Sequence, residues 1–545
     1  MKANLKKWLS ILLVMTMVVA LFAGCKQDPV TTDPGKTEPG KTDPKPTESK
    51  PAEEDTLSGT ITIGVIARAG AQEAYEALAA AYKQKHPNVN IVIDLKAQDG
   101  YNDWVASLDN VANPEVDLVE YFAGGSDHTR LLVLSDYLDV ESPYSDGTWG
   151  EQIQSAALGN SAITGETCQL SLFSTQVMWI YNQEIFQKVG VEPPKTWDEF
   201  VTVCEKVYAA GYQPIAQSYQ YLPEWLAQIY MDQTTRSTVS LVAAQPGDFC
   251  YDPDVDGKWS MDITNPWNDT GDKVNFNIVR ALKTAKEGVW ALNSEGGKTV
   301  WNNFAKVFPK YAGGDAFFTV DGGGISDLFY QSKAAMTFQG GWALISFQRT
   351  LNELKENGSY VDENGNTVTA EGFSIGTFAM PTMEGAGIEA PVRTIEMPTS
   401  GFCIMNKDQE HNDLVMDFIM YYSSEEGMSI YVDALLAAGG TIDGPCLVNG
   451  VAFPEEFAPM FENLTSIGNV QTGYAYAFAT AVPYVTESAR EFDNFAYEYL
   501  NGRMTLDEFV SKVDANTAKY IPYLQQALNI SDADLENPAN APVGY

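Results

Sequence analysis

The sequence predicts an α/β fold in which strands alternate with helices. Residues 60–66 alternate Ile61, Ile63 and Val65 with other side chains, which is the two-residue period of a strand. Apolar residues then recur at helical spacing over residues 71–82, and the alternation of strand and helix continues downstream. Strands separated by helices of this length favour a parallel sheet that helices cover on both faces.

The next elements follow in the same order. The pair His86-Pro87 ends the first helix, because a residue before proline disfavours helical dihedral angles. Residues 89–95 and 116–122 are expected as strands, with a helix over residues 102–108 between them.

Two capping boxes mark the starts of later helices. Thr196 with Glu199, and Thr505 with Glu508, place a hydroxyl and a carboxylate where the first turn of a helix has unpaired N–H groups. A hairpin is expected at Asn364-Gly365, since this dipeptide favours a two-residue turn. These motifs are structural and predict no chemistry.

Length and charge limit the classes of function. A chain of 545 residues has room for more than one domain. Its 72 acidic residues against 34 basic ones give a formal net charge of −38, which disfavours nucleic acid and anionic lipid as partners. Three histidines and widely scattered cysteines argue against a His/Cys metal centre, and we expect no cofactor.

The N-terminus has the pattern of an exported lipoprotein. Lys2, Lys6 and Lys7 precede an apolar run over residues 8–23, which is short for a membrane span but suits a signal peptide. Small residues before Cys25 resemble a bacterial lipobox, so residues 1–24 are expected as a lipoprotein signal peptide and Cys25 as the lipid anchor. A membrane helix that happens to end at a cysteine is the alternative.

Residues 25–56 are expected to form a disordered, lipid-anchored linker. The stretch has almost no large apolar side chains and repeats TDPGK, TEPGK and TDPKP over residues 32–46. Such a composition cannot offset the entropy of ordering the chain, and regular prolines keep it extended. We therefore expect a folded body held at the outer face of the bacterial cell membrane.

The remaining cysteines are interpreted mainly as small buried hydrophobic residues. They are Cys168, Cys204, Cys250, Cys403 and Cys446. Because five is an odd number, at least one of them is a thiol or pairs between chains, and the sequence leaves any pairing open.

Five segments along the chain form a recognisable series: KHPNV (85–89), YNQEIF (181–186), GVEPPKTWDE (190–199), AAMTFQGGW (334–342) and NGRMTLDE (501–508). In this order they resemble the extracellular solute-binding proteins of ABC transporters, family 1, which bind carbohydrates. The resemblance implies a two-lobed, periplasmic-binding-protein-like (type II) α/β fold with the ligand in a cleft between the lobes. Lobe 1 is then expected over residues 57–168 plus 337–398, and lobe 2 over residues 169–336 plus 399–545.

The resemblance also implies a function without catalysis. The protein is expected to be a monomeric receptor that binds a neutral sugar or oligosaccharide and delivers it to ABC permease subunits in the membrane. A surface glycoside hydrolase with two carboxylates is an alternative, although 72 acidic residues always allow such a pair to be imagined. A sensor that reports ligand occupancy to a membrane histidine kinase is another alternative, and the sequence does not separate it from transport.

Ligand contacts are expected where strands end, because open α/β sheets bind ligands at the carboxyl ends of their strands. Trp342 is the strongest candidate, since it follows a predicted strand and Gly340-Gly341, and an indole offers a flat apolar platform to a sugar ring. A tryptophan that packs two helices in the core is the alternative. The other candidates are Arg68, Gln98, Glu120, Tyr121, Asp127, Tyr219, Trp225 and Arg393, each against the alternative of a loop or core residue.

Asp252, Asp254 and Asp256 resemble the start of a calcium loop, with carboxylates at alternate positions and Gly257 for the turn. The twelfth position of that loop is Ile263, so the bidentate carboxylate is missing. A hairpin at Asp256-Gly257 is the favoured interpretation.

Overall fold

The computed structural model describes residues 57–108, 111–120, 130–160, 167–362, 364–399, 401–452, 455, 457–461 and 467–542. The predicted signal peptide and linker lie outside these described residues. Residues 55–545 form one compact unit. Among the helices of the described residues, none combines the length and the apolar character that crossing a bilayer requires.

The first of two main sheets has six strands in the order β2-β1-β3-β13-β5-β4. Their bounds are β1 (Gly59–Ile66), β2 (Val89–Lys96), β3 (Leu118–Glu120), β4 (Leu158–Asn160), β5 (Thr167–Leu170) and β13 (Phe402–Ile404). Strand β1 is parallel to β2 and β3, as predicted. Strand β13 is antiparallel to both of its neighbours, so the sheet is mixed rather than wholly parallel.

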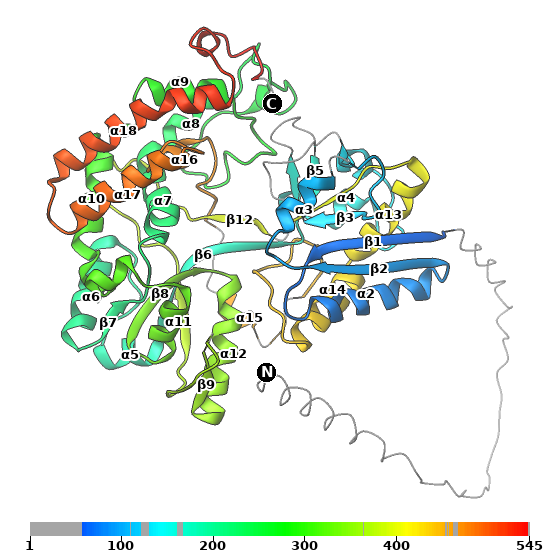
Figure 1. Cartoon of the computed structure of the whole chain (residues 1–545), viewed down its shortest axis with the longest axis horizontal. Helices are drawn as coiled ribbons and strands as arrows, with labels where there is room; N and C mark the ends of the chain where they lie inside the picture. The colour runs from blue at the N-terminus through cyan, green and yellow to red at the C-terminus, as the bar shows by residue number, and fades with distance from the viewer. Residues whose placement is uncertain are drawn as a thin grey trace, which may run out of the picture. The chain divides into compact units, whose positions relative to one another are not determined.

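Helices cover both faces of this first sheet. On one face lie α2 (Ala71–Lys85), α13 (Gln409–Tyr422) and α14 (Glu425–Ala437), and Figure 1 shows α2 and α14 beside β1 and β2. On the other face lies α3 (Tyr101–Leu108). Successive residues of β3 separate the two apolar clusters: Leu118 belongs to the cluster with α2, and Val119 to the cluster with α3.

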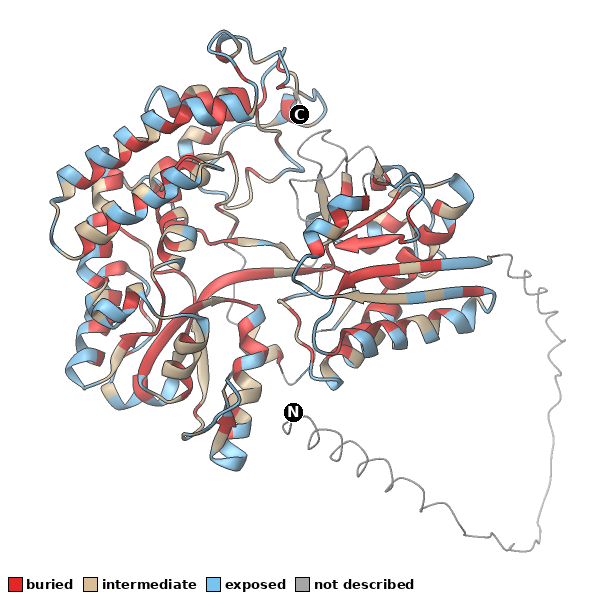
Figure 2. Ribbon diagram, in the orientation of Figure 1, coloured by how far each residue is buried: buried red, intermediate tan, exposed pale blue. Residues whose placement is uncertain are grey.

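The second sheet has the strand order β11-β6-β8-β7, with β12 pairing β6 as well. The strands are β6 (Phe173–Asn182), β7 (Gln213–Ile215), β8 (Ala334–Gly340), β11 (Ile375–Phe378) and β12 (Glu396–Thr399). Strand β8 is antiparallel to β6 and parallel to β7. Most residues of β6 and β8 are buried, and both strands appear largely red in Figure 2.

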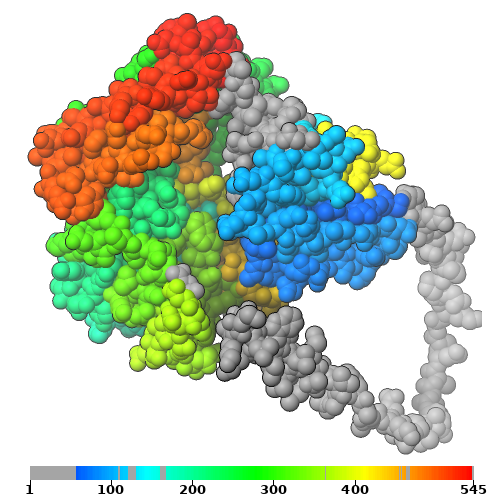
Figure 3. All heavy atoms as spheres, viewed as in Figure 1, coloured from blue at the N-terminus to red at the C-terminus, as the bar shows by residue number. Residues whose placement is uncertain are grey.

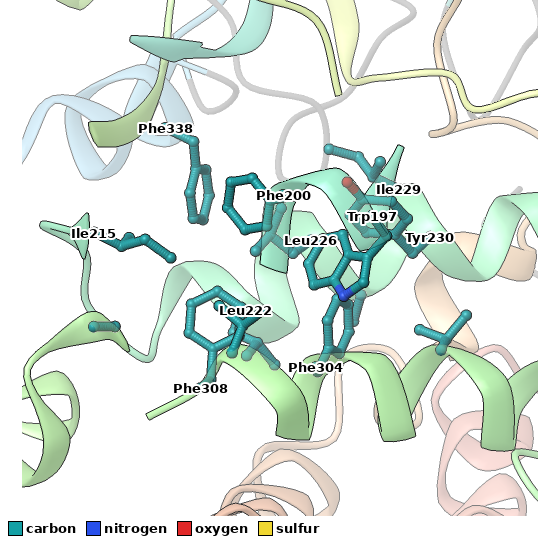
Figure 4. Close-up of a cluster of buried hydrophobic side chains, with 14 of the residues drawn as sticks. Trp197, Phe200, Ile215, Leu222, Leu226, Ile229, Tyr230, Phe304, Phe308 and Phe338 are labelled. Atoms are coloured by element: carbon teal, nitrogen blue, oxygen red, sulfur yellow. The ribbon is translucent and has the colours of Figure 1, made fainter. Parts of the chain in front are cut away.

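Helices pack on both faces of the second sheet as well. They are α5 (Gln183–Val189), α6 (Trp197–Ala209), α7 (Ala227–Thr235), α10 (Glu295–Val307), α11 (Gly322–Tyr330) and α12 (Trp342–Asn357). Figure 4 shows side chains of α6, α7 and α10, among them Trp197, Tyr230 and Phe304, directed toward one another. These aromatic residues are fully buried and form the core beside β6 and β8.

A further helical layer covers the second sheet's core at the C-terminal end of the chain. Its helices are α8 (Val239–Val242), α9 (Ile278–Lys286), α16 (Ala475–Phe478), α17 (Thr486–Leu500) and α18 (Leu506–Ala527). In the space-filling view of Figure 3, the orange and red surface of α17 and α18 lies over the green segment that contains α10. The short helices are α4 (Trp149–Gln152), α15 (Ala458–Phe461), η2 (Leu134–Tyr137), η3 (Ser155–Ala157), η5 (Arg236–Thr238), η7 (Lys310–Ala312), η8 (Gly314–Phe318) and η9 (Asp534–Glu536).

The local signals of the sequence are confirmed. In both capping boxes the threonine hydroxyl accepts a hydrogen bond from the backbone N–H of the glutamate, and the glutamate carboxylate accepts one from the backbone N–H of the threonine. The expected hairpin forms from β9 (Ser359–Val361) and β10 (Thr367–Thr369), which pair antiparallel on either side of Asn364-Gly365.

Sheet pairing differs from the expected division into lobes. Strands β8, β11 and β12, which overlap the predicted return to lobe 1 over residues 337–398, all belong to the second sheet. Strand β13 and helices α13 and α14, predicted for lobe 2, pack with the first sheet. Strand β8 pairs along β6, and α12 packs against the second sheet. The chain therefore stays with the second sheet through β12 and returns to the first sheet only between β12 and β13.

Candidate ligand-binding site

A cavity of about 1000 Å³ lies where segments of both sheets meet. The first sheet contributes Leu158 of β4 and Thr167 of β5. The second sheet contributes residues 174–176 of β6 and the facing residues 396–398 of β12. Loops complete the wall with residues 267, 270–273, 445–447 and 469–474.

The lining combines aromatic rings with amide and hydroxyl groups. The aromatic members are Trp267, Phe276, Phe461, Tyr474 and Tyr476. The amide and hydroxyl members include Gln154, Ser155, Ser174, Thr175, Gln176, Asn469, Gln471 and Thr472. Apolar walls with a few polar groups that fix orientation are typical of small-molecule sites. Aromatic faces and neutral hydrogen-bonding groups suit a ligand that has both apolar C–H faces and hydroxyl groups.

The charged groups of the cavity lining sum to a small net negative charge. They are Asp272, Lys273 and Glu396. The Lys273 ammonium donates to the Trp267 carbonyl oxygen at 2.6 Å, and Glu396 Oε2 accepts from the Ile467 backbone N–H at 3.1 Å. This balance of charges favours a neutral ligand over an anion.

Trp267 is held by a loop that two buried arginines fix. Arg236 donates to the Asn265 carbonyl oxygen at 3.0 Å, and Arg393 donates to the Pro266 carbonyl oxygen at 3.2 Å. The Trp267 backbone N–H in turn donates to Asn265 Oδ1 at 3.0 Å. Both arginines also bind Asp269, so the loop that presents the indole is attached to the protein at several points.

The Asp269 carboxylate also binds a second segment of the cavity wall, residues 469–474. Thr472, which lines the cavity, donates its hydroxyl hydrogen to Asp269 Oδ2. Burial acts to raise the pKa of Asp269, but Arg393, Arg236 and the Thr472 hydroxyl outweigh it and hold that pKa below its ordinary value. Asp269 therefore remains ionised and joins the Trp267 loop to the segment of residues 469–474.

Backbone strain marks this second segment. Gly473 has φ of 63°, and Tyr474 follows with φ of 67°, a left-handed conformation that is uncommon outside glycine. Tyr474 precedes α16 and lines the cavity. Strained backbone tends to persist at functional sites, where the surrounding structure enforces it.

A second aromatic cluster contains two predicted site residues. The rings of Trp225 and Trp342 meet edge to face with centroids 5.8 Å apart, and Tyr221 lies 4.5 Å from Trp225. Trp225 belongs to the π-helix η4 (Leu222–Leu226), a form that is frequent at functional sites. Trp342 begins α12, as predicted, and 36% of its surface is exposed.

Two glycines place Trp342 beside the cavity. A Cβ atom on Gly340 would lie 2.1 Å from the Trp342 ring, so only glycine lets the indole fold back over the chain. The Gly341 backbone N–H donates to Thr175 Oγ1 at 3.0 Å, and Thr175 lines the cavity. Trp342 therefore directly follows, in the sequence, a residue that hydrogen-bonds to the cavity wall.

The predicted residues of the first sheet form a separate group. Arg68 donates through both Nη atoms to the two carboxylate oxygens of Glu120, each at 2.6 Å. The Ile66 backbone N–H also donates to Glu120 Oε1 at 3.1 Å. Gln98 is exposed, and its carbonyl oxygen accepts from the Tyr101 backbone N–H at 3.2 Å. Arg68, Gln98 and Glu120 are not among the residues that line the cavity.

Tyr219 is half-buried and packs against the core beside the second sheet. Its hydroxyl donates to Asp493 Oδ1 at 3.0 Å, and its ring packs against Phe317 and Phe318. Burial, followed by the nearby Asp493 carboxylate, raises the pKa of Tyr219 well above its ordinary value. Tyr121 and Asp127, the last two predicted contacts, lie outside the described residues.

Arg393, another predicted contact, is buried inside the protein and is not among the residues that line the cavity. Arg393 is 2% exposed and donates to Asp232, Asp269 and the Pro266 carbonyl oxygen through four hydrogen bonds. A guanidinium group has five N–H donors, so the network uses nearly all of them. Buried carboxylates far away in the sequence, invisible to local pattern, make Arg393 a structural residue.

In the calcium-like loop, the Asp252 and Asp256 carboxylates accept hydrogen bonds from nearby backbone N–H groups. The Asp256 carboxylate is buried and accepts from the Asp252 backbone N–H, from the Asn275 backbone N–H and from Asn275 Nδ2. Asp252 Oδ1 accepts from the Asp254 backbone N–H at 2.8 Å. Within the described residues, no three histidine, cysteine or acidic side chains converge as metal ligands.

The hairpin expected at Asp256-Gly257 is wrong. These residues form a single 3₁₀ turn, η6 (Asp256–Lys258), because the three hydrogen bonds to Asp256 fold the chain back on itself.

The cavity residues are largely ones that sequence reasoning missed. Trp267 lies in the loop that follows η6, and Gln176 lies inside a buried strand. Gln471 and Tyr474 belong to a loop rather than to the end of a strand. A search restricted to the carboxyl ends of strands therefore passes over them.

Cys446 is the only cysteine that lines the cavity among the described residues. Burial raises the pKa of its thiol to about 11, so the thiol is protonated at neutral pH and is a poor nucleophile.

Solved structures of the same fold cover most of the chain. A chitin oligosaccharide binding protein matches with a TM-score of 0.53 and 16% identity, over 85% of this chain and 99% of its own. A protein from a study of xylan utilization by Caldanaerobius polysaccharolyticus matches with a TM-score of 0.52 and 15% identity, over 84% of this chain and 99% of its own. The bacterial solute receptor AcbH matches with a TM-score of 0.52 and 14% identity, over 86% of this chain and 100% of its own. At these identities the likeness establishes the fold.

No curated protein sequence matches the chain. The family model described as bacterial extracellular solute-binding protein matches residues 68–429, which is more than half of the sequence. The two sheets with their covering helices agree with the two-lobed α/β fold of that family. The chain belongs to the bacterial extracellular solute-binding proteins.

Proposed function

We propose that this protein binds a neutral sugar or oligosaccharide in the cavity and delivers it unchanged to ABC permease subunits in the membrane. The carrying observation is the cavity lining, which sets Trp267, Tyr474 and Tyr476 among amide and hydroxyl groups. Ligand sites of about 300–1000 Å³ hold drug-sized molecules, so a cavity of about 1000 Å³ has room for more than one sugar ring.

The matched structures support a carbohydrate as the ligand class. One is described as a chitin oligosaccharide binding protein, and AcbH is described as preferring β-D-galactopyranose. The small negative excess of the lining agrees with a neutral ligand. We extend the site to Trp225 and Trp342, because their rings are in contact and Gly341, the neighbour of Trp342, hydrogen-bonds to Thr175 of the cavity wall.

The proposal includes a mechanism in which the segments around the two sheets close on the sugar. A ligand that contacts both sets of segments shifts the population toward the closed form, because it binds that form more tightly. We place the boundary between the two lobes at the crossings between β5 and β6 and between β12 and β13. Anchoring through Cys25 and the linker would keep the receptor near its permease and raise its effective concentration there.

A panel of oligosaccharides in a thermal-shift assay tests the ligand class. We expect at least one sugar to raise the melting temperature, since a ligand that binds only the folded state stabilises it by mass action. A panel of short peptides is the comparison, and a shift with peptides alone would replace the sugar by a peptide.

Two tryptophan variants then test the site with the sugar that gives the largest shift. We expect Trp267→Ala and Trp342→Ala each to weaken binding by about 1–3 kcal/mol, because each removes an aromatic contact from a desolvated pocket. Tyr523→Ala is the matched control, since Tyr523 is 57% exposed on α18 and does not line the cavity. Equal affinity of Trp267→Ala and the control would remove the cavity from the proposal.

Two further experiments address catalysis and anchoring. The bound sugar should be recovered intact after overnight incubation, whereas steady release of reducing ends would identify a glycoside hydrolase. Cys25→Ala should release the protein from the membrane fraction into the medium. Retention of that variant in the membrane would argue for a spanning segment in place of a lipid.

A further inference from the structure

Two buried cysteines from neighbouring strands meet in the first sheet. Cys168 lies in β5 and is 4% exposed, and Cys403 lies in β13 and is 0% exposed. Strands β5 and β13 pair antiparallel through Leu170 and Phe402. The two cysteines belong to one apolar cluster with Val119, and their thiols are hydrogen-bond partners.

A β-bulge brings Cys168 to this face of the sheet. Strand β4 pairs Gly159 with Gln169 and then Asn160 with Thr167, so the ladder passes over residue 168. In a regular strand Cys168 would share the face of Leu170, which packs in the other apolar cluster of this sheet. An extra residue re-aims the side chains next to it, and here it turns Cys168 toward Cys403.

We propose that Cys168 and Cys403 form a disulfide bond that cross-links β5 to β13. The reaction is thiol–disulfide exchange with a disulfide oxidant RSSR, for which oxidised glutathione serves in solution. The Cys403 thiolate attacks one sulfur of RSSR and displaces RS⁻, giving a mixed disulfide. The Cys168 thiolate then attacks the Cys403 sulfur and displaces the second RS⁻. Two thiols are oxidised, one RSSR is reduced to two RSH, and the two protons of the cysteines end on the released thiols.

The position of the pair suits this bond. The two thiols already contact each other from adjacent strands, and a disulfide requires side chains that point toward one another in this way. Proteins that work outside the cytoplasm meet oxidising conditions, and this chain belongs to an extracellular family. Of the other cysteines in the described part of the chain, Cys204 packs in the core of the second sheet, and Cys250 and Cys446 lie on separate loops.

Burial decides when the bond forms. Desolvation raises the pKa of the Cys403 thiol well above its ordinary value, which suppresses the reactive thiolate in the folded protein. The exchange therefore takes place while β5 and β13 are still accessible during folding, and the finished bond is then shielded from reductants. Since Thr167 lines the ligand cavity, the bond also fixes one wall of that cavity from the adjacent residue.

Differential alkylation of the full chain tests the bond. The chain is exported from a bacterial host, unfolded in denaturant with iodoacetamide to block thiols, then reduced, labelled with a second reagent and mapped by peptide mass. A parallel sample is unfolded, reduced and refolded in a buffer of oxidised and reduced glutathione. We expect the peptides of Cys168 and Cys403 to carry the second label in either preparation, with the linked peptide found before reduction.

Two variants make the assignment specific. Cys168→Ala should leave Cys403 fully blocked by iodoacetamide, and the control Cys204→Ala should leave the Cys168–Cys403 linkage unchanged. Iodoacetamide blocking of both Cys168 and Cys403 in both preparations would overturn the proposal. Linkage of either residue to a different cysteine would overturn it as well.

Discussion

Neutralising Asp269 should destabilise the protein strongly, because this carboxylate is the centre of a buried ion-pair network. Asp269 is 0% exposed and accepts hydrogen bonds from Arg236, Arg393 and Thr472. Arg393 also binds Asp232 at 2.6 and 2.9 Å. The network thus holds two cations and two anions, whose formal charges cancel.

The change Asp269→Asn leaves one uncompensated positive charge among these four groups. Arg236 loses the one carboxylate with which it forms an ion pair among the described residues, and its side chain is 1% exposed, so water cannot replace the lost partner. Its Nε–H already lacks a hydrogen-bond partner in the described part of the chain. Removing one member of a buried ion pair costs about 3–5 kcal/mol, and we expect a loss of this size in the free energy of unfolding.

Urea denaturation followed by tryptophan fluorescence measures the loss. Asp262→Asn is the matched control, because Asp262 lies a few residues earlier on the same loop but is exposed, and its change should leave the midpoint nearly unaltered. The double variant Arg236→Gln with Asp269→Asn restores neutrality and should be more stable than Asp269→Asn alone. A midpoint for Asp269→Asn equal to that of Asp262→Asn would refute the role assigned to the network.

Two more predictions concern acid stability and backbone packing. Asp248 accepts from Arg280 at 2.6 and 2.8 Å, and although burial opposes it, this pairing lowers the pKa of Asp248 below the ordinary value of about 3.9. The stabilisation is therefore present above about pH 4 and is lost as pH falls through the lower folded value, so Arg280→Gln should shrink the acid loss seen in urea midpoints from pH 5 to pH 2. An equal fall of the urea midpoint from pH 5 to pH 2 in the unchanged protein and in Arg280→Gln would contradict this prediction. Gly341→Ala would place a Cβ atom 2.2 Å from the Asp443 carbonyl oxygen, and we expect a loss of about 1–3 kcal/mol in calorimetry. Gly271→Ala, with open space around it, is the control, and equal melting temperatures would show that the contact is relieved without cost.

The secondary structure and its caps could be predicted from the sequence because they depend on near neighbours. The alternation of Ile61, Ile63 and Val65 predicts β1, and the capping boxes at Thr196 and Thr505 mark helix starts that the structure confirms. The placement of Trp342 at the start of α12 also follows from local signals. Each of these involves groups within a few residues of one another, where backbone geometry leaves few choices.

The ligand site and its supports depend on contacts between distant segments. Trp267 and Gln176 become neighbours of one cavity only when the loop after η6, strand β6 and the segment before α16 are brought together. Arg393 has the same charge in either interpretation, and only the approach of Asp232 and Asp269 makes it structural rather than ligand-binding. Similarly, Cys168 meets Cys403 only because of the β-bulge in β5.

The sequence by itself determined the class of fold, the order of its elements and the family. Tertiary structure alone decided which strands share a sheet, which side chains line the cavity and which charges are buried together. The physical reason is range: periodicity and capping act over one or two turns of chain, whereas burial and ion pairing depend on residues hundreds of positions apart that packing brings into contact.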